Sequence, residues 1–355
     1  GRSPDKVPTA GLWPDMVIEI EPQRPDGGRI VWEWHAWDHL VQSINPRLSN
    51  YGDPADFPGR IDINGDLEEE TTAEELEQLQ ALGYVSAETN EEDLRSDLFH
   101  SNGIDYNAEL DQIVLSVRRY SEFWIIDHST TTEEAASSSG GRWGRGGEIL
   151  YRWGNPAAYG RGDDEAQSLF YQHDARWIPD GYPGAGNLTV FSNEMGDQEG
   201  PYSAVYELAL PMADDGSYLL PPEEPYGPQE PVWSYRGTAE HFFFAPFISG
   251  AERQPNGNTL ICSGPQGRFF EVTPEGEIVW EFWDPRQGEV RLPDGSPPHP
   301  VDEFTHAVFR ASRIPPDHPA FAGRDLQPLD PQPEVATRPA DGEVGGEEEE
   351  STASR

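Results

Sequence analysis

Short runs of alternating apolar and polar residues recur along the chain, and turns rich in glycine and proline separate them. The runs at 16–21 and 29–34 flank a turn at 25–28, which predicts a β-hairpin. The stretch at 171–191 has the same order of strand, turn and strand, and His173 lies near its beginning. Because long amphipathic helices are nearly absent, the pattern predicts an all-β protein. Further strands are predicted at 98–106, 113–118, 123–127, 148–153, 204–208, 231–235, 242–248, 259–262, 269–272, 277–282 and 307–311.

A weak repeat connects four of these strands. Each copy has a turn glycine or proline, then an aliphatic pair, then spaced aromatic residues. Four-stranded units that each end in such a strand are typical of β-propeller blades. A β-sandwich explains the strands but not the recurring aromatic strand, so we predict a propeller. The copies lie at 28–34, 147–153, 231–235 and 276–282.

Three segments differ from the β pattern. Residues 66–97 contain twelve acidic residues and one arginine, and we expect a surface insertion there with a short helix at 72–83. Residues 129–147 are rich in serine, threonine and glycine and predict a long loop. From about 330 the chain is dominated by Pro, Glu and Gly, so we expect one domain over 1–330 and a disordered acidic tail at 331–355.

The charge balance is strongly acidic. The chain has 65 acidic residues against 24 basic ones, a net charge of −41, and Lys6 is its one lysine. Such a surface suits high salt, where screening removes the self-repulsion, so we expect a halophilic source. A mesophilic protein with acidic insertions is the alternative. Either way, nucleic acid and anionic membranes are expected to be poor partners.

The composition also limits the kinds of site. Cys262 is the one cysteine, which excludes an internal disulfide and a site with several cysteine ligands. No run of about 18 apolar residues occurs, so no transmembrane helix and no membrane insertion are expected. The chain starts at Gly1 without a methionine or a signal peptide, which fits either a mature or a truncated protein.

One group of polar residues could bind an anion. His100 and Asn102 are two apart, and in a strand they would point to the same face. Arg118 closes the following strand, so a hairpin could bring its guanidinium to the same end. Charged and neutral donors around one point suit a tetrahedral oxyanion such as sulfate. The alternative interpretation is that these residues are a loop histidine, an asparagine in a turn and a surface arginine.

A histidine at the start of a hairpin is the second candidate. A neutral imidazole nitrogen can attack sulfur or phosphorus, so His173 could be a nucleophile. A hydrogen-bonded structural histidine is the alternative. Metal binding is weakly indicated: His35 and His39 are four apart, but they follow a predicted strand, so the spacing of a zinc site on a helix does not apply. The segment 62–66 is similar to part of a calcium loop but lacks the distal glutamate. We predict no metal.

These residues occur in stretches that together resemble the bacterial arylsulfate sulfotransferases, which use phenol sulfates and no nucleotide sulfate donor. The resemblance covers residues 16 to about 325, and the order and spacing of the stretches are more specific than any single motif. The stretches are 31–34 with 37–39, 99–102, 113–118, 151–156, 172–175, 256–261 and 308–311.

The resemblance implies a six-bladed β-propeller with its active site at the central channel, and thus a catalytic domain over 1–330. His173 matches the histidine that becomes sulfated, His100 and Asn102 match the pair that binds the sulfuryl group, and Arg118 matches the arginine that neutralises it. Ser249 is the equivalent of a late hydroxyl residue, and a lysine beside it has no counterpart. A further histidine of the family would lie upstream of residue 16. About four blades are visible, so we expect missing N-terminal blades.

The function that the resemblance implies is ping-pong transfer of a sulfuryl group from an aryl sulfate to a phenolic acceptor, through a sulfohistidine at His173. No cofactor is expected. The partners would be these two small molecules, the location periplasmic or extracellular, and a homodimer is compatible with the family. A propeller that only binds or scaffolds, and an aryl sulfate hydrolase, are the alternatives.

Overall fold

Strands form almost all of the regular structure in the computed structural model, which describes residues 1–9, 11–66, 73, 76, 77, 80, 85, 86, 88–197, 200–237, 243–284, 307–316 and 318–327. The strands in these ranges are β1 (Met16–Pro22), β2 (Gly28–His35), β3 (Leu40–Val41), β4 (Ile61–Asp62), β5 (Ser101–Asn107), β6 (Gln112–Val117), β7 (Glu122–Asp127), β8 (Tyr151–Trp153), β9 (His173–Trp177), β10 (Leu188–Asp197), β11 (Gly200–Leu208), β12 (Trp233–Arg236), β13 (Gly250–Arg253), β14 (Thr259–Ser263), β15 (Arg268–Val272) and β16 (Ile278–Trp283).

Helices are short in the same ranges. The α-helices are α2 (Glu91–Leu94) and α3 (Thr132–Ala135), and the 3-10 turns are Pro4–Lys6, Ala36–His39, Pro54–Asp56, Arg118–Tyr120, Pro156–Tyr159, Asp164–Ala166, Gly264–Gln266 and Pro319–Phe321. The all-β prediction is confirmed. None of the helices described is long and apolar enough to span a bilayer.

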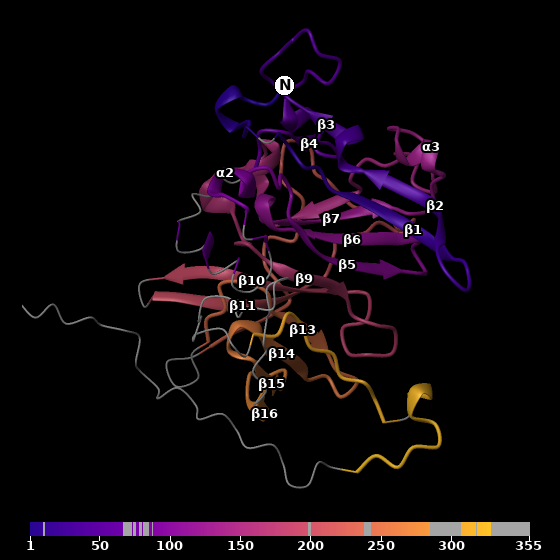
Figure 1. Ribbon diagram of the computed structural model, residues 1–355, viewed down its shortest axis with the longest axis vertical. Coiled ribbons are helices and arrows are strands. Elements are labelled where there is room, and N and C mark those ends of the chain that lie inside the picture. Colours follow the sequence, from indigo (N-terminus) through magenta and orange to yellow (C-terminus); the bar gives the residue numbers. More distant parts are fainter. Residues whose placement is uncertain are drawn as a thin grey trace, which may run out of the picture.

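Three sheets of the same design follow one another in the chain. Their strand orders are β5-β6-β7-β8, β9-β10-β11-β12 and β13-β14-β15-β16, and each is an antiparallel meander. The pairs β1-β2 and β3-β4 form two-stranded sheets. Figure 1 shows the sheets that contain β7, β10 and β14 in chain order along the long axis of the molecule. A two-sheet sandwich does not describe this arrangement.

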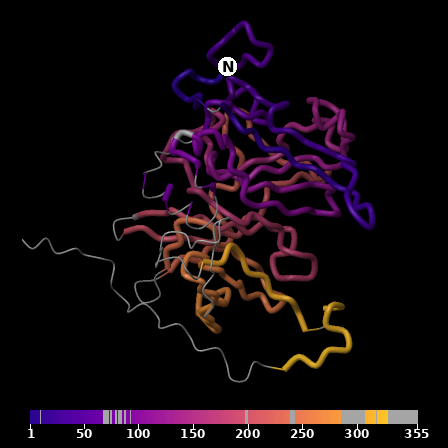
Figure 2. Tube along the Cα trace, in the orientation of Figure 1, coloured from indigo at the N-terminus to yellow at the C-terminus, as the bar shows by residue number. Residues whose placement is uncertain are grey.

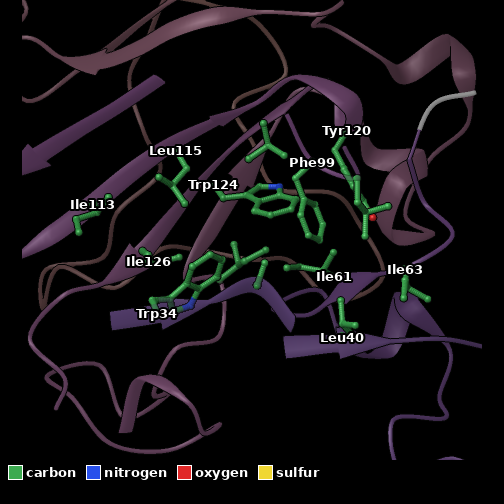
Figure 3. Close-up of a cluster of buried hydrophobic side chains, with 14 of the residues drawn as sticks. Trp34, Leu40, Ile61, Ile63, Phe99, Ile113, Leu115, Tyr120, Trp124 and Ile126 are labelled. Carbon is green, nitrogen blue, oxygen red and sulfur yellow. The ribbon is translucent and has the colours of Figure 1, made fainter. Parts of the chain in front are cut away.

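The middle strands of the first four-stranded sheet are buried on both faces. Every residue of β6 and β7 is buried. Because side chains alternate across a strand, Leu115 and Trp124 face one apolar cluster while Val114 and Phe123 face another. Figure 3 shows the first cluster, where Trp34 of β2 lies beside Trp124 and Ile126. The second cluster joins this sheet to the next one.

The sheets are therefore separated by apolar layers. Phe191 and Tyr235 of the second sheet pack with Ile261 and Phe270 of the third in a further cluster. The aromatic repeat of the sequence corresponds to β2, β8, β12 and β16, and each of these is an edge strand of its sheet. This part of the pattern is confirmed at all four copies.

The first strands of the three sheets lie next to one another. Strand β9 contacts both β5 and β13. The segment that contains Val308 and Phe309 returns to the third sheet, and Figure 2 shows it in yellow beside the orange strands. The Val308 N–H donates to Gly264 O at 2.9 Å, and the Ser249 N–H donates to Phe309 O at 3.1 Å. Chain segments far apart in sequence thus meet at the starts of these strands.

Two predicted strands are wrong. Residues 307–311 are irregular, because they bond to two different segments through single hydrogen bonds instead of a ladder. Residues 243–249 are irregular as well, and the strand begins only at Gly250. Ile248 and Ser249 have φ of 48° and 86°, which a strand cannot contain. Residue 242 lies outside the described residues.

The predicted loop at 129–147 contains α3, whose Thr131 and Glu134 form a capping box. Of the predicted helix at 72–83, most residues lie outside the described ranges, as does the whole tail at 331–355. The end of the acidic insertion is not merely a solvated face. Leu94 O accepts a hydrogen bond from Arg119 Nη2 at 2.8 Å, and the backbone of Asp97 forms an isolated parallel β-bridge with Trp13.

Candidate active site

His173 is the first residue of β9, and its side chain is buried, with 3% of the residue exposed. Its Nδ1 lies 2.8 Å from Oδ1 of Asn193 on the neighbouring strand β10. The ring of Phe309 stands edge-on to the imidazole, with 6.1 Å between ring centroids. The ring is therefore held at Nδ1 by a polar partner and packed on one side by an aromatic one.

Burial and charge keep the His173 imidazole neutral. Burial is the largest cause and lowers the pKa of His173 to about 3, and the hydrogen bond that its Nδ1 donates to Asn193 Oδ1 only partly opposes it. The charge of Arg118 lowers the pKa further, as does that of His100 when its imidazole is protonated. Both side chains are thus close enough for their charges to influence the ring.

His100 lies just ahead of β5 in a left-handed backbone conformation, with φ of 51°. The reason given for pairing it with Asn102 is therefore wrong, because alternation across a strand does not apply to a residue outside the strand. Its Nδ1 bonds Asp97 Oδ2 at 2.6 Å, and its N–H donates to Asp97 Oδ1 at 3.1 Å. Burial acts to raise the pKa of Asp97, but its contacts with His100 and the charge of Arg119 lower it below the usual value. Sequence reasoning missed this carboxylate.

Arg118 follows β6 and begins a 3-10 turn. Its N–H donates to His100 O at 3.3 Å, which ties the two residues together through the backbone. The guanidinium carbon lies 4.6 Å from the centroid of the Tyr171 ring. A cation on an aromatic face keeps its positive charge, which can attract an anion.

Asn102 supports the chain just before His173. Its Nδ2 donates to Gln172 O at 2.8 Å, and its Oδ1 is buried with no hydrogen-bond partner among the residues described. Ser116 Oγ donates to the same carbonyl at 3.3 Å. The amide of Asn102 thus joins β5 to β9 beside the imidazole.

Ser249 is buried and belongs to a tight corner. Its Oγ accepts from Gly264 N–H at 3.0 Å and donates to Phe247 O at 3.3 Å. Within the described part of the chain, no hydrogen bond joins Ser249 to the other four predicted residues. The backbone carbonyl of the neighbouring Ile248, however, accepts a hydrogen bond from Asn193 Nδ2 at 2.9 Å.

An arginine from the end of the described chain was not predicted as a site residue. Arg310 Nη1 pairs with Asp174 Oδ1 at 3.1 Å, and its Nη2 donates to Asn102 O at 3.3 Å. It therefore links β5 to β9 next to His173. The only signal in the sequence was its place in the stretch 308–311, which carries part of the family resemblance.

The other candidate ligands are engaged elsewhere. His39 stacks on Trp34, and its Nε2 lies 2.8 Å from Ala135 O. Asp66, at the end of the calcium-like segment, pairs with Arg2 at 2.7 Å. Across the ranges described, no three His, Cys, Asp or Glu side chains gather as a metal would require.

A model of the arylsulfotransferase (ASST) family matches residues 4–291 of the chain. The chain belongs to the arylsulfotransferase family. The matched range of this arylsulfotransferase contains all five predicted site residues and also Asn193 and Asp97, whereas Arg310 lies beyond it.

The search of solved structures found a similarity to the crystal structure of a protein of unknown function from Bacteroides caccae. The identity is 14%, the TM-score is 0.30, and the alignment covers 56% of this arylsulfotransferase and 51% of that chain. The chain thus spans about half the length of that protein. No curated protein matches the chain.

Proposed function

We propose that this arylsulfotransferase moves a sulfuryl group from an aryl sulfate to a phenol, with His173 as the residue that carries the group between them. The observation that supports this most is a buried imidazole kept neutral beside Arg118 and His100. A neutral nitrogen is the form that can attack, and a nearby guanidinium is a suitable partner for a sulfuryl oxygen.

The donor half-reaction uses the ring nitrogen that does not face Asn193. Nε2 of His173 attacks sulfur, the N–S bond forms, and the bond from sulfur to the aryl oxygen breaks. The phenolate leaves with the electron pair, and it is a tolerable leaving group because phenols have a pKa near 10. Arg118 neutralises the sulfuryl oxygens, an effect on the order of 3 kcal/mol for a well-placed donor.

The acceptor half-reaction needs a base. His100 has its Nδ1 on the Asp97 carboxylate, which leaves Nε2 to accept a proton. We assign His100 this role: it takes the phenol proton as the phenol oxygen attacks sulfur. The N–S bond then breaks, and its electron pair returns to Nε2 of His173.

Positive charge at the site is local. The whole chain carries a net charge of −41, which repels a sulfate monoester at long range. Arg118 and Arg310 both lie near His173, the second of them held by Asp174. At high salt the long-range repulsion is screened while these short contacts persist, which agrees with the predicted halophilic source.

The six-bladed propeller of the family is supported by the meander sheets, the apolar layers between them, and the contact of β9 with β5 and β13. The three four-stranded sheets and the β1-β2 hairpin correspond to the four blades expected from the sequence. The site residues would then face the central channel. A periplasmic or extracellular location and a homodimer rest on the family alone.

The test is to trap the intermediate. Brief exposure to a chromogenic aryl sulfate without acceptor should release phenol and leave one SO₃ group on the peptide that contains His173, seen by mass spectrometry. His173→Asn should abolish both the release of phenol and the labelling of the peptide. His318→Gln, a change at an exposed histidine, should leave both unchanged. Phenol release that continues for many turnovers without acceptor would indicate a hydrolase, and an unmodified peptide in an active enzyme would contradict the proposal.

A further inference from the structure

Asn193 lies in an irregular part of strand β10, beside the candidate nucleophile. The register between β10 and β11 shifts between Ser192 and Met195, and the N–H groups of Asn193 and Glu194 both donate to Phe170 O, at 3.1 and 3.2 Å. A bulge of this kind redirects a side chain relative to the regular pleat. The Asn193 side chain is fully buried and reaches His173.

The amide of Asn193 can have only one orientation. Its Nδ2 donates to Ala245 O at 2.7 Å and to Ile248 O at 2.9 Å. Carbonyl oxygens only accept, so the amide nitrogen, not its oxygen, must face them. Oδ1 then faces Nδ1 of His173 at 2.8 Å, and because Oδ1 also only accepts, Nδ1 must carry the proton.

The support of Asn193 extends to its backbone. Ser203 Oγ donates to Asn193 O at 2.7 Å and accepts from Ala245 N–H at 2.9 Å. The same hydroxyl therefore holds both the asparagine and one of the two carbonyls that orient its amide. All of these groups are buried, so water cannot replace a lost partner without reorganisation.

We infer that Asn193 is a positioning residue, which holds His173 as the tautomer with its proton on Nδ1 and its lone pair on Nε2. This inference rests on the proposed function, because it matters for the reaction only if Nε2 attacks sulfur. In the other tautomer the attacking nitrogen would carry a hydrogen and have no lone pair. After attack the ring carries a positive charge, and Oδ1 of Asn193 continues to accept the Nδ1 proton.

The first experiment measures the tautomer without substrate. Protein labelled with ¹⁵N-histidine should show, for the signal that disappears in His173→Asn, a protonated Nδ1 and an unprotonated Nε2. A proton on Nε2 in the wild-type protein would overturn the inference, whether or not any variant folds.

The second experiment measures the rate of sulfation of His173 in one turnover. Asn193→Leu keeps a similar volume but cannot orient the ring, and we expect the rate to fall on the order of 10- to 100-fold with little change in KM for the aryl sulfate. Asn187→Leu is the matched control, because Asn187 also donates a side-chain hydrogen bond in this sheet, to Glu207 at 2.6 Å, away from His173.

The results separate the two proposals. An unchanged sulfation rate in folded Asn193→Leu would overturn the role of Asn193, as would an equal loss in Asn187→Leu. Absence of sulfohistidine in an active wild-type enzyme whose His173 carries its proton on Nδ1 would instead overturn the proposed function. If Asn193→Leu shows a mixture of the two His173 tautomers together with slower sulfation, the result would support both the role of Asn193 and the proposed function.

Discussion

The Glu122 carboxylate and the Arg152 guanidinium form an ion pair from which solvent is excluded: both side chains are 0% exposed. Nε of Arg152 lies 2.9 Å from Oε1 of Glu122, and the guanidinium carbon lies 4.4 Å from the centroid of the Tyr159 ring. The backbone carbonyl of Glu122 also accepts a hydrogen bond from the Gln172 side chain, next to His173. The Glu122 backbone is thus linked by a hydrogen bond to the residue that precedes His173.

Removal of one partner of this pair should be costly. Glu122→Gln would leave Arg152 charged and buried, so we expect the free energy of unfolding to fall by about 3–5 kcal/mol in urea titrations. Glu21→Gln is the control, because Glu21 pairs with Arg29 at 2.8 Å while both side chains are more than half exposed. The control should lose no more than about 1 kcal/mol. Equal losses of unfolding free energy in the two variants would show that the destabilisation does not depend on the burial of the ion pair.

The absence of a side chain at Gly250 makes room for Asp174. A Cβ at Gly250 would lie 2.2 Å from Asp174 Oδ2, which accepts from Ala251 N–H at 3.0 Å. Gly250→Ala should displace this carboxylate and its partner Arg310, lower the free energy of unfolding by about 1–3 kcal/mol, and slow sulfation of His173. Gly196→Ala, where a Cβ would meet nothing within 4 Å, should change neither measurement. Thermal unfolding and the single-turnover assay provide the comparison.

The depressed pKa of His173 makes stability depend on pH. In the unfolded chain His173 binds its proton near pH 6.5, but in the folded protein its pKa is about 3. The unfolded state therefore binds more protons below about pH 6.5, and stability falls as the pH falls through that value. From about pH 7.5 to about pH 5.5 this histidine should account for about 1.4 kcal/mol of lost stability.

His173→Gln should remove that contribution, so its free energy of unfolding should fall less than that of the wild type over the same range. Urea titrations at the two pH values measure the difference. Parallel losses in wild type and variant would mean that His173 titrates normally in the folded protein.

The His100–Asp97 pair should matter for one half-reaction only. Asp97→Asn removes the charge that orients and supports His100 as a base, so return of the sulfuryl group to a phenol should slow by on the order of 100-fold. The initial burst of phenol, which reports sulfation of His173, should persist in stopped-flow records. Asp111→Asn is the matched control, because Asp111 makes the same kind of bond to His128, at 2.7 Å, outside the site. A lost burst in Asp97→Asn would place the pair in the donor step instead.

Local alternation was enough to locate most of the strands. The edge strands β2, β8, β12 and β16 were recognisable from their aromatic spacing, because the spacing of aromatic residues within one strand is a local feature of the chain. The same local reasoning failed at 307–311, where the residues make single hydrogen bonds to two segments and have no strand partner.

The residue types at the candidate site were also visible in the sequence. His173, His100 and Arg118 could be named because each stands in a distinctive stretch, and Arg118 and protonated His100 influence His173 through their charges. Their partners could not be named. Asp97 was one of twelve acids in an insertion, and Asn193 had no motif at all.

What the sequence by itself determined was an all-β chain of short strands, the aromatic edge strands, and a set of candidate side chains. Only the tertiary structure decided which nitrogen of His173 carries the proton. That choice depends on the carbonyls of Ala245 and Ile248, which lie far along the chain and orient Asn193. The direction of a hydrogen bond depends on which donors and acceptors lie next to each other in the folded protein. The order of residues along the chain does not show which distant groups become neighbours.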